Sequence, residues 1–267
     1  MHTWYWRNWQ GMTYLSCSLL EAWPHGFFTQ KFWPRSPQEL TAVLHPDAIG
    51  YRLKQVHGNT VLTPSEICNH LSKTGLQEEE DSALAAGDGL ITEKPLQAVW
   101  VATADCTPVL IGDRKTGRVA ALHAGWRGTA AKIVPQAIAR LQAQGSNIQD
   151  LRIAMGPAIA GEVYQVSLQV AAQLGASIIP HEEETVIIKA LQELPTSPLL
   201  PDPDPERIRI DVRQVNVLQM EKMGISLEQI AIAPYCTYQT PEHFFSYRRD
   251  NLKKVQWSGI VSINPGS

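Results

Sequence analysis

The hydrophobic pattern between residues 99 and 122 predicts buried neighbouring strands. Two apolar stretches rich in β-branched residues lie on either side of residues 113–117, which have the composition of a turn. Cys106 lies within the first stretch and His123 directly follows the second. Because adjacent strands lie close together, this arrangement can bring a thiol and an imidazole to one place.

Alternation of apolar and polar residues predicts strands in other parts of the chain as well. They are an aromatic-rich hairpin over residues 4–20 and strands over 25–30, 50–58, 88–92, 149–156, 230–233 and 255–263. In the strand predicted over 50–58, the period of two places Gln55 and His57 on the same face.

Capping residues delimit the predicted helices. Ser36, Pro37 and Glu39 have the pattern of a capping box with proline at the first helical position. Gly224 can end an amphipathic helix over 210–223. A further helix is predicted over 129–142, after the flexible Gly125 and Gly128, and loops are predicted over 64–87 and 191–206.

This order of elements mixes hairpins with isolated helices and lacks regular βαβ alternation. It predicts an α+β fold with mixed β-sheets and flanking helices. The 267 residues can bury a large core, and we expect one domain over residues 1–267.

The amino-acid composition indicates which binding partners and which cellular compartment to expect. An apolar fraction of 44% with 18% charged residues indicates a globular protein, and a net charge of −3 favours neither nucleic acid nor an anionic membrane. No apolar run has the length of a transmembrane helix, and the first residues lack the pattern of a signal peptide. The four cysteines are dispersed, which is typical of a reducing compartment, so a cytoplasmic protein is expected.

The sequence lacks the common motifs of nucleotide-binding, hydrolase and metalloprotease sites, and three side chains remain as candidates for an active site. The glycine-rich nucleotide-binding motifs, the GxSxG elbow and HExxH are all missing. His57, Cys106 and His123 remain, each near the end of a predicted strand. Two imidazoles and a thiolate suit a zinc ion with an open fourth position, but they equally suit a cysteine nucleophile activated by histidine. A structural zinc site would need a fourth ligand, for which Cys236 is the candidate, but we expect Cys236 to be a core residue.

Five sequence blocks together resemble the laccase-domain family. They are QVHG at 55–58, TADC at 103–106, HAGWRG at 123–128, GPAI at 156–159 with Tyr164 seven residues after Pro157, and FFSYRRD at 244–250. The resemblance runs from about Gly26 to Ile263. Members of this family were first described as multicopper polyphenol oxidases and are now described as purine nucleoside phosphorylases, and related members are called peptidoglycan editing factors. The resemblance also implies a fold similar to that of the cysteine-deamidase toxins.

The resemblance implies a function and a metal site. His57, Cys106 and His123 match the family's zinc-binding and catalytic residues, with copper the less favoured metal. The implied activity is phosphorolysis of adenosine, inosine and methylthioadenosine, with deamination of adenosine in addition. The partners expected are therefore purine nucleosides and phosphate, in a monomer or homodimer. The alternatives are a cysteine hydrolase or peptidoglycan-precursor editing enzyme that uses Cys106 and His123, and a polyphenol oxidase.

The candidate substrate-binding residues are Arg127, Arg248, Asp105 and Gln55. A phosphate needs cationic partners, and Arg127 leads because it follows His123 within a glycine-flanked turn. Gln30 stands where the family often has a phosphate-binding arginine, so Arg35 is a further possibility. Asp105 can orient a ligand or carry a proton, and Asp88 has the same two interpretations with the structural one favoured.

Overall fold

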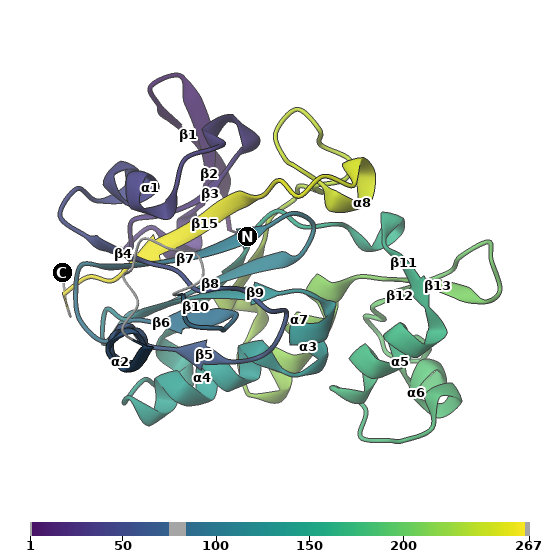
Figure 1. Ribbon diagram of the computed structural model, residues 1–267. Coiled ribbons are helices and arrows are strands. Elements are labelled where there is room, and N and C mark those ends of the chain that lie inside the picture. The colour runs from purple at the N-terminus through teal and green to yellow at the C-terminus, as the bar shows by residue number, and fades with distance from the viewer. Residues whose placement is uncertain (1, 75–83, 265–267) are drawn as a thin grey trace.

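The structure, a computed structural model, describes residues 2–74 and 84–264 (Figure 1). Within these residues the strands form two six-stranded sheets and one three-stranded sheet. The first sheet has the order β1 (Trp4–Trp9), β2 (Met12–Cys17), β3 (His25–Phe28), β15 (Gln256–Val261), β7 (Gln97–Thr103), β4 (Ile49–Tyr51). The second has the order β14 (Ile230–Ile232), β10 (Leu151–Met155), β8 (Thr107–Asp113), β9 (Val119–Ala124), β6 (Gly89–Ile91), β5 (Val61–Leu62). The third has the order β11 (Gln165–Ser167), β13 (Arg207–Ile210), β12 (Leu199–Leu200).

Helices cover the outer faces of the two large sheets and one end of the molecule. The helices are α1 (Pro37–Leu44), α2 (Pro64–Thr74), α3 (Trp126–Ala130), α4 (Ile133–Ala143), α5 (Leu168–Ala176), α6 (Glu184–Gln192), α7 (Val212–Lys222) and α8 (Tyr247–Asp250). In Figure 1, α3, α4 and α7 lie beneath the second sheet, and α5 and α6 lie with the third sheet at one end. This architecture confirms the predicted α+β class with mixed sheets and flanking helices.

The two large sheets pack face to face, with β8 and β9 at the centre of the molecule. Leu110 and Ala121 face the first sheet, where they join the core formed with Val99 and Val101. Their neighbours along the strands, among them Ile111, face the opposite way and pack against α4 and α7. Every residue of both strands is buried, which explains why the sequence there is apolar at consecutive positions.

The antiparallel pairing of β8 with β9 sets the position of the reactive residues. The register places Pro108 opposite His123 and Thr107 opposite Ala124. Cys106 directly precedes β8, so its thiol lies beside His123 at the same edge of the sheet. The sequence-based expectation that neighbouring strands bring the two side chains together is confirmed.

The prediction of a strand over residues 50–58 was wrong beyond Tyr51. After β4 the chain leaves the sheet, and His57 adopts a left-handed backbone conformation with φ +59. The backbone N–H groups of Val56, His57 and Gly58 donate to the Asp88 carboxylate instead of to a neighbouring strand. The period of two therefore does not decide where the His57 side chain points.

The prediction of a loop over residues 64–87 was wrong in its first part, which forms α2. Thr63 and Glu66 bond reciprocally across Pro64, the side chain of each accepting from the backbone N–H of the other. This is the pattern that Ser36, Pro37 and Glu39 form before α1, where the predicted capping box is confirmed. The acidic run Glu78–Asp81 lies outside the described residues.

Two other predicted elements also differ from the structure. The helix predicted over 129–142 is divided into α3 and α4 at Lys132, which is left-handed with φ +60. The break places Pro135 in the first turn of α4, where its missing N–H costs no helical hydrogen bond. The Ala131 carbonyl, four residues before Pro135, accepts from Asn59 Nδ2 at 2.8 Å. The loop predicted over 191–206 contains β12 and the end of α6.

The end of α7 confirms its predicted boundary. Asp211 caps the helix by accepting from the N–H groups of Arg213 and Gln214, and Gly224 follows it with φ +90. No helix in residues 2–74 and 84–264 is both long and apolar enough to cross a membrane.

Candidate active site

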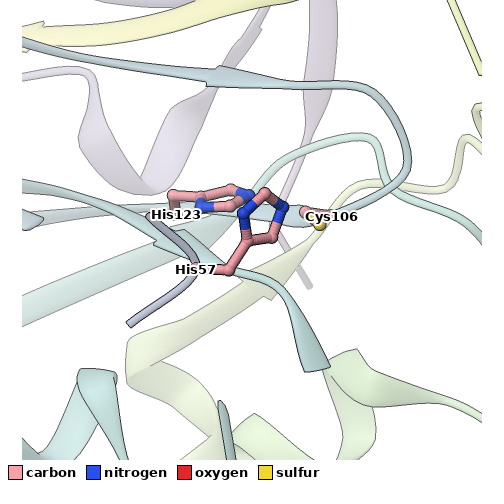
Figure 2. Close-up of side chains that lie close together, drawn as sticks. All are labelled: His57, Cys106 and His123. Carbon is pink, nitrogen blue, oxygen red and sulfur yellow. The ribbon is translucent and has the colours of Figure 1, made fainter. Parts of the chain in front are cut away.

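Three segments that are distant in the sequence bring His57, Cys106 and His123 together (Figure 2). His57 comes from the turn after β4, Cys106 from the segment before β8, and His123 from β9. One ligand atom from each lies within 4.8 Å of those of the other two, and the two imidazole rings meet edge to face with centroids 4.8 Å apart. His123 is buried, whereas His57 is exposed, so the group opens toward solvent on one side.

Asp88, which directly precedes β6, holds two members of this group. Its Oδ1 lies 2.8 Å from His123 Nδ1 and accepts from the His57 N–H at 2.9 Å. Its Oδ2 accepts from the N–H groups of Gly58 and Val56 at 2.7 and 3.2 Å. One buried carboxylate therefore orients the His123 ring and fixes the turn that carries His57. A carboxylate behind a ligating histidine is the arrangement by which proteins orient metal ligands.

The charges of the group reinforce one another. Burial raises the pKa of the Cys106 thiol, but hydrogen bonds with His123 and His57 outweigh it and lower that pKa to about 7. Burial lowers the pKa of His123, but hydrogen bonds with Asp88 and Cys106 raise it to about 9. Burial also opposes the charge of Asp88, yet its bond with His123 and its backbone N–H donors leave the pKa of Asp88 lowered. Between about pH 7 and pH 9, the thiolate form of Cys106 and the imidazolium form of His123 are therefore favoured together.

The donor set fits a zinc ion. Imidazole nitrogen and thiolate sulfur are the ligands that zinc prefers, and one such atom from each of the three residues lies within 4.8 Å of the other two. In the described part of the chain, this is the one group of three or more such side chains close enough to share an ion.

Cys236 is buried among Ile159 and Ala160, and its sulfur accepts from the Ala160 N–H, so the expectation that it is a core residue is confirmed.

The group lies in a cavity of about 960 Å³ between the edges of the two large sheets and α8. Tyr164, Tyr247 and Trp257 give the cavity aromatic surface. Its cationic lining residues are Arg52, Lys54, Arg248, Lys253 and Lys254. A larger depression of about 1310 Å³ runs along β14, but it contains none of the three residues of the group. The cavity at Cys106 is therefore the candidate active site.

Gln55 and Asp105 both line this cavity, but their polar groups also hold its walls together. The Gln55 amide donates to the Ala102 carbonyl and accepts from the Ala102 N–H, at 2.8 and 2.7 Å. The Asp105 carboxylate accepts from the Thr237 hydroxyl and from the Arg248 N–H, both at 2.7 Å. Asp105 has φ +90, a conformation unusual for a residue other than glycine. It therefore ties the Cys106 segment to the start of α8.

The two candidate arginines differ in position. Arg248 lines the cavity, where Nη1 donates to the Gln165 carbonyl at 3.0 Å and the guanidinium lies 4.9 Å from the ring centre of Tyr164. Arg127 is exposed on α3, with its guanidinium over the ring of Trp126, and it is not among the described residues that line the cavity. Arg248 is thus the better placed of the two to meet a ligand.

The positions of Gln30 and Arg35 do not favour a role in the cavity. Gln30 donates to the Pro241 carbonyl, and Arg35 lies over the ring of Trp9. Neither is among the described residues that line the cavity. Sequence reasoning missed the role of Asp88 in holding His57, although Asp88 begins the strand predicted over 88–92. It gave no role to Tyr164, although Tyr164 belongs to one of the five blocks.

Gly125 leaves the space that the Cys106 sulfur occupies. A Cβ at this position would lie 2.8 Å from Cys106 Sγ. We therefore expect Gly125→Ala to displace the sulfur and to lower zinc affinity about ten-fold or more, since ligand geometry controls affinity. Gly175→Ala is the matched control, because its Cβ would meet Ile187 and Leu191, which line neither the cavity nor the recess beside Cys106. Zinc titration of both proteins checks this expectation, and equal affinities would contradict it.

The sequence matches the model of a known protein family. The model described as multi-copper polyphenol oxidoreductase laccase matches residues 37–262, which carry all three members of the group. The chain belongs to this laccase family. The similarity to the family is thus not confined to the five short blocks but extends over residues 37–262.

Two relatives of this chain are named for different enzymatic activities. A Synechocystis protein named purine nucleoside phosphorylase is 51% identical over 97% of both chains. A protein of an unknown prokaryote named adenosine deaminase is 27% identical over 64% of this chain and 60% of its own length. The crystal structure of YlmD from Geobacillus stearothermophilus has the same fold, with a TM-score of 0.77, 22% identity and coverage of 97% and 99% of the two chains.

Proposed function

We propose that this chain is a zinc-dependent purine nucleoside phosphorylase that acts on adenosine, inosine and methylthioadenosine. The observation that carries the proposal is the cavity in which His57, Cys106 and His123 converge beside the cationic Arg248. The Synechocystis relative, which matches 97% of this chain, carries the name of this activity. The aromatic cavity wall suits a purine, and the cationic side suits phosphate.

In the proposed reaction, a phosphate oxygen forms a bond to the ribose anomeric carbon and the glycosidic carbon–nitrogen bond breaks. The electron pair of that bond leaves with the purine base, which takes up a proton. The second product is ribose 1-phosphate, or 5-methylthioribose 1-phosphate when the substrate is methylthioadenosine. Arg248 binds the phosphate, and Tyr247 and Trp257 cover the base from water. Zinc held by His57, Cys106 and His123 supplies Lewis-acid chemistry when it is bound.

We further propose that the same cavity deaminates adenosine. A distant relative is named adenosine deaminase, and an open metal position is a common requirement for hydrolytic removal of an amino group. In this reaction water adds at the purine carbon that bears the amino group, and ammonia leaves. Formation of inosine from adenosine without phosphate, followed spectrophotometrically, tests this second activity.

The experiment that tests the phosphorylase is base release from inosine by the zinc-loaded protein, with and without phosphate. We expect hypoxanthine to form only when phosphate is present. Release that is independent of phosphate would indicate a hydrolase and would contradict the proposal. Protein carrying Cys106→Ala serves as the control for contaminating enzymes.

Arg248 is expected to contribute most to phosphate binding. Replacing Arg248 with alanine should raise the KM for phosphate about ten- to a hundred-fold, which corresponds to the loss of a hydrogen bond to a charged group. Arg127→Ala, which removes an exposed arginine on α3, should have a smaller effect. Steady-state kinetics with phosphate varied at fixed inosine check both variants. A larger rise of the KM for phosphate in Arg127→Ala than in Arg248→Ala would instead place the phosphate beside α3.

A cysteine hydrolase is the second candidate, and one observation favours it. Cys106 lies beside His123 with a pKa lowered to about 7, which is the state of a cysteine nucleophile. Alkylation by iodoacetamide separates the two functions. A zinc ligand should react slowly until a chelator removes the metal, whereas a free nucleophile should react at the same rate with and without the chelator.

A multicopper polyphenol oxidase is not supported by the ligand set. Such a site needs several copper ions, each with its own ligands. The residues that the structure describes bring together one group of three ligands, which is sufficient for one ion. We therefore keep zinc as the proposed metal and copper as the alternative occupant of the same three ligands.

A further inference from the structure

Tyr164 is held in place at the boundary between the cavity and the protein core. It follows the short 3-10 helix η4 (Gly161–Val163), its N–H donates to the Gly161 carbonyl, and its own carbonyl accepts from the Ile210 N–H. The ring packs against the cluster of Ile159, Ala160 and Cys236, and the guanidinium of Arg248 lies 4.9 Å from its centre. The ring therefore has little freedom to turn away from the cavity.

The hydroxyl of Tyr164 differs in its hydrogen bonding from that of Tyr235, another half-buried tyrosine. Tyr235 accepts a hydrogen bond from Trp6 Nε1 at 3.0 Å. The Tyr164 hydroxyl makes no hydrogen bond within residues 2–74 and 84–264 and is not fully buried, so it is open to the cavity that Tyr164 lines. Tyr164 lines the cavity and also a recess of about 40 Å³ beside Cys106. An unused donor thus stands next to the reactive group.

The charges around Tyr164 indicate which ligand the hydroxyl meets. A tyrosine hydroxyl is neutral at physiological pH and can donate a hydrogen bond. The Arg248 guanidinium, 4.9 Å from the centre of the Tyr164 ring, adds a positive charge on the same side of the cavity. A hydroxyl donor beside a guanidinium suits an anionic acceptor, and phosphate is the anion that the proposed reaction requires.

We propose that Tyr164 is a catalytic residue whose hydroxyl donates a hydrogen bond to the phosphate bound by Arg248. This inference rests on the proposed phosphorylase function. With one phosphate oxygen held by Tyr164 and others by Arg248, the phosphate cannot rotate freely, and the remaining oxygen is directed at the ribose anomeric carbon. The residue thus acts on orientation as well as on affinity.

The test is Tyr164→Phe in the zinc-loaded protein, which removes the hydroxyl and keeps the ring under Arg248. We expect the KM for phosphate to rise about ten- to a hundred-fold, with the KM for inosine unchanged within about two-fold. The stabilisation that inorganic phosphate gives to the wild type in thermal unfolding should be reduced in the variant. Tyr238→Phe, at an exposed tyrosine outside the cavity lining, is the matched control.

The possible outcomes separate this inference from the function on which it rests. If the wild type releases base without phosphate, the phosphorylase proposal fails. If the wild type requires phosphate but Tyr164→Phe leaves the KM for phosphate and the thermal shift unchanged, the role of Tyr164 is wrong. A rise confined to the KM for inosine would also overturn it, because the hydroxyl would then contact the nucleoside.

Discussion

Replacing Asp88 with alanine should destabilise the protein by about 3–5 kcal/mol and lower its zinc affinity about ten- to a hundred-fold or more. The substitution leaves the buried His123 Nδ1 without its acceptor and also removes the acceptor of the N–H groups of Val56, His57 and Gly58. The turn that carries His57 then loses the bonds that shape it. Chemical denaturation of the metal-free protein and zinc titration measure the two effects separately.

Asp113→Ala is the matched control for this prediction. Asp113 is also buried, and its carboxylate accepts from the N–H groups of Lys115 and Thr116 and from the Thr116 hydroxyl. It stands at the opposite end of β8 from Cys106. Asp113→Ala should therefore lower stability but leave zinc affinity unchanged. A similar loss of affinity in both variants would show that Asp88 acts only through overall stability.

The stabilising effect of Asp88 should also depend on pH. Its pKa is lower in the folded protein than its ordinary value of 3.8. A carboxyl with a lowered folded pKa contributes its full stabilisation above its unfolded pKa and loses it as the pH falls through the folded value. The stability difference between the wild type and Asp88→Ala should therefore be largest near neutral pH and should shrink below about pH 4.

Cys106→Ala should abolish zinc binding at stoichiometric concentrations and abolish turnover, while the protein stays folded. Only His57 and His123 of the three ligands would remain. The two main cores, on either side of β8 and β9, contain none of the three ligands. Elemental analysis and thermal unfolding measure the outcome. Full zinc retention would contradict the ligand assignment, and loss of cooperative unfolding would instead indicate a structural zinc ion.

Zinc affinity should rise with pH, since the metal displaces protons. In the metal-free protein His123 is protonated up to about pH 9 and Cys106 up to about pH 7. Between these values, binding releases the His123 proton, and affinity should rise about ten-fold per pH unit. Below pH 7 the Cys106 proton is released as well, and the slope should approach a hundred-fold per unit. Competition titrations with a chelator of known zinc affinity measure these slopes.

The sequence predicted the part of the site that depends on one hairpin. The apolar runs around residues 113–117 specify β8 and β9, and their register brings Cys106 beside His123. The position of His57 could not be obtained in the same way. Its backbone is shaped by the Asp88 carboxylate, which lies 31 residues further along the chain. A contact of that kind leaves no periodic pattern in the sequence around His57.

Local signals explain the other differences between sequence and structure. The Thr63–Glu66 capping box was available in the sequence and predicts α2 by the rule that correctly predicted α1. Pro135 likewise marks the break between α3 and α4. The third sheet is different, because β12 has only two residues and exists through pairing with β13. Strands that short are specified by their tertiary partners.

The central claim is that the His57, Cys106 and His123 cavity performs phosphorolysis, and the identity of the sugar product tests it most directly. Zinc-loaded protein, inosine and inorganic phosphate can be followed together by phosphorus NMR. We predict that the phosphate signal decreases as a ribose 1-phosphate signal appears in equal amount with hypoxanthine, and that Cys106→Ala shows neither change. Hypoxanthine formed with free ribose and an undiminished phosphate signal would contradict the claim.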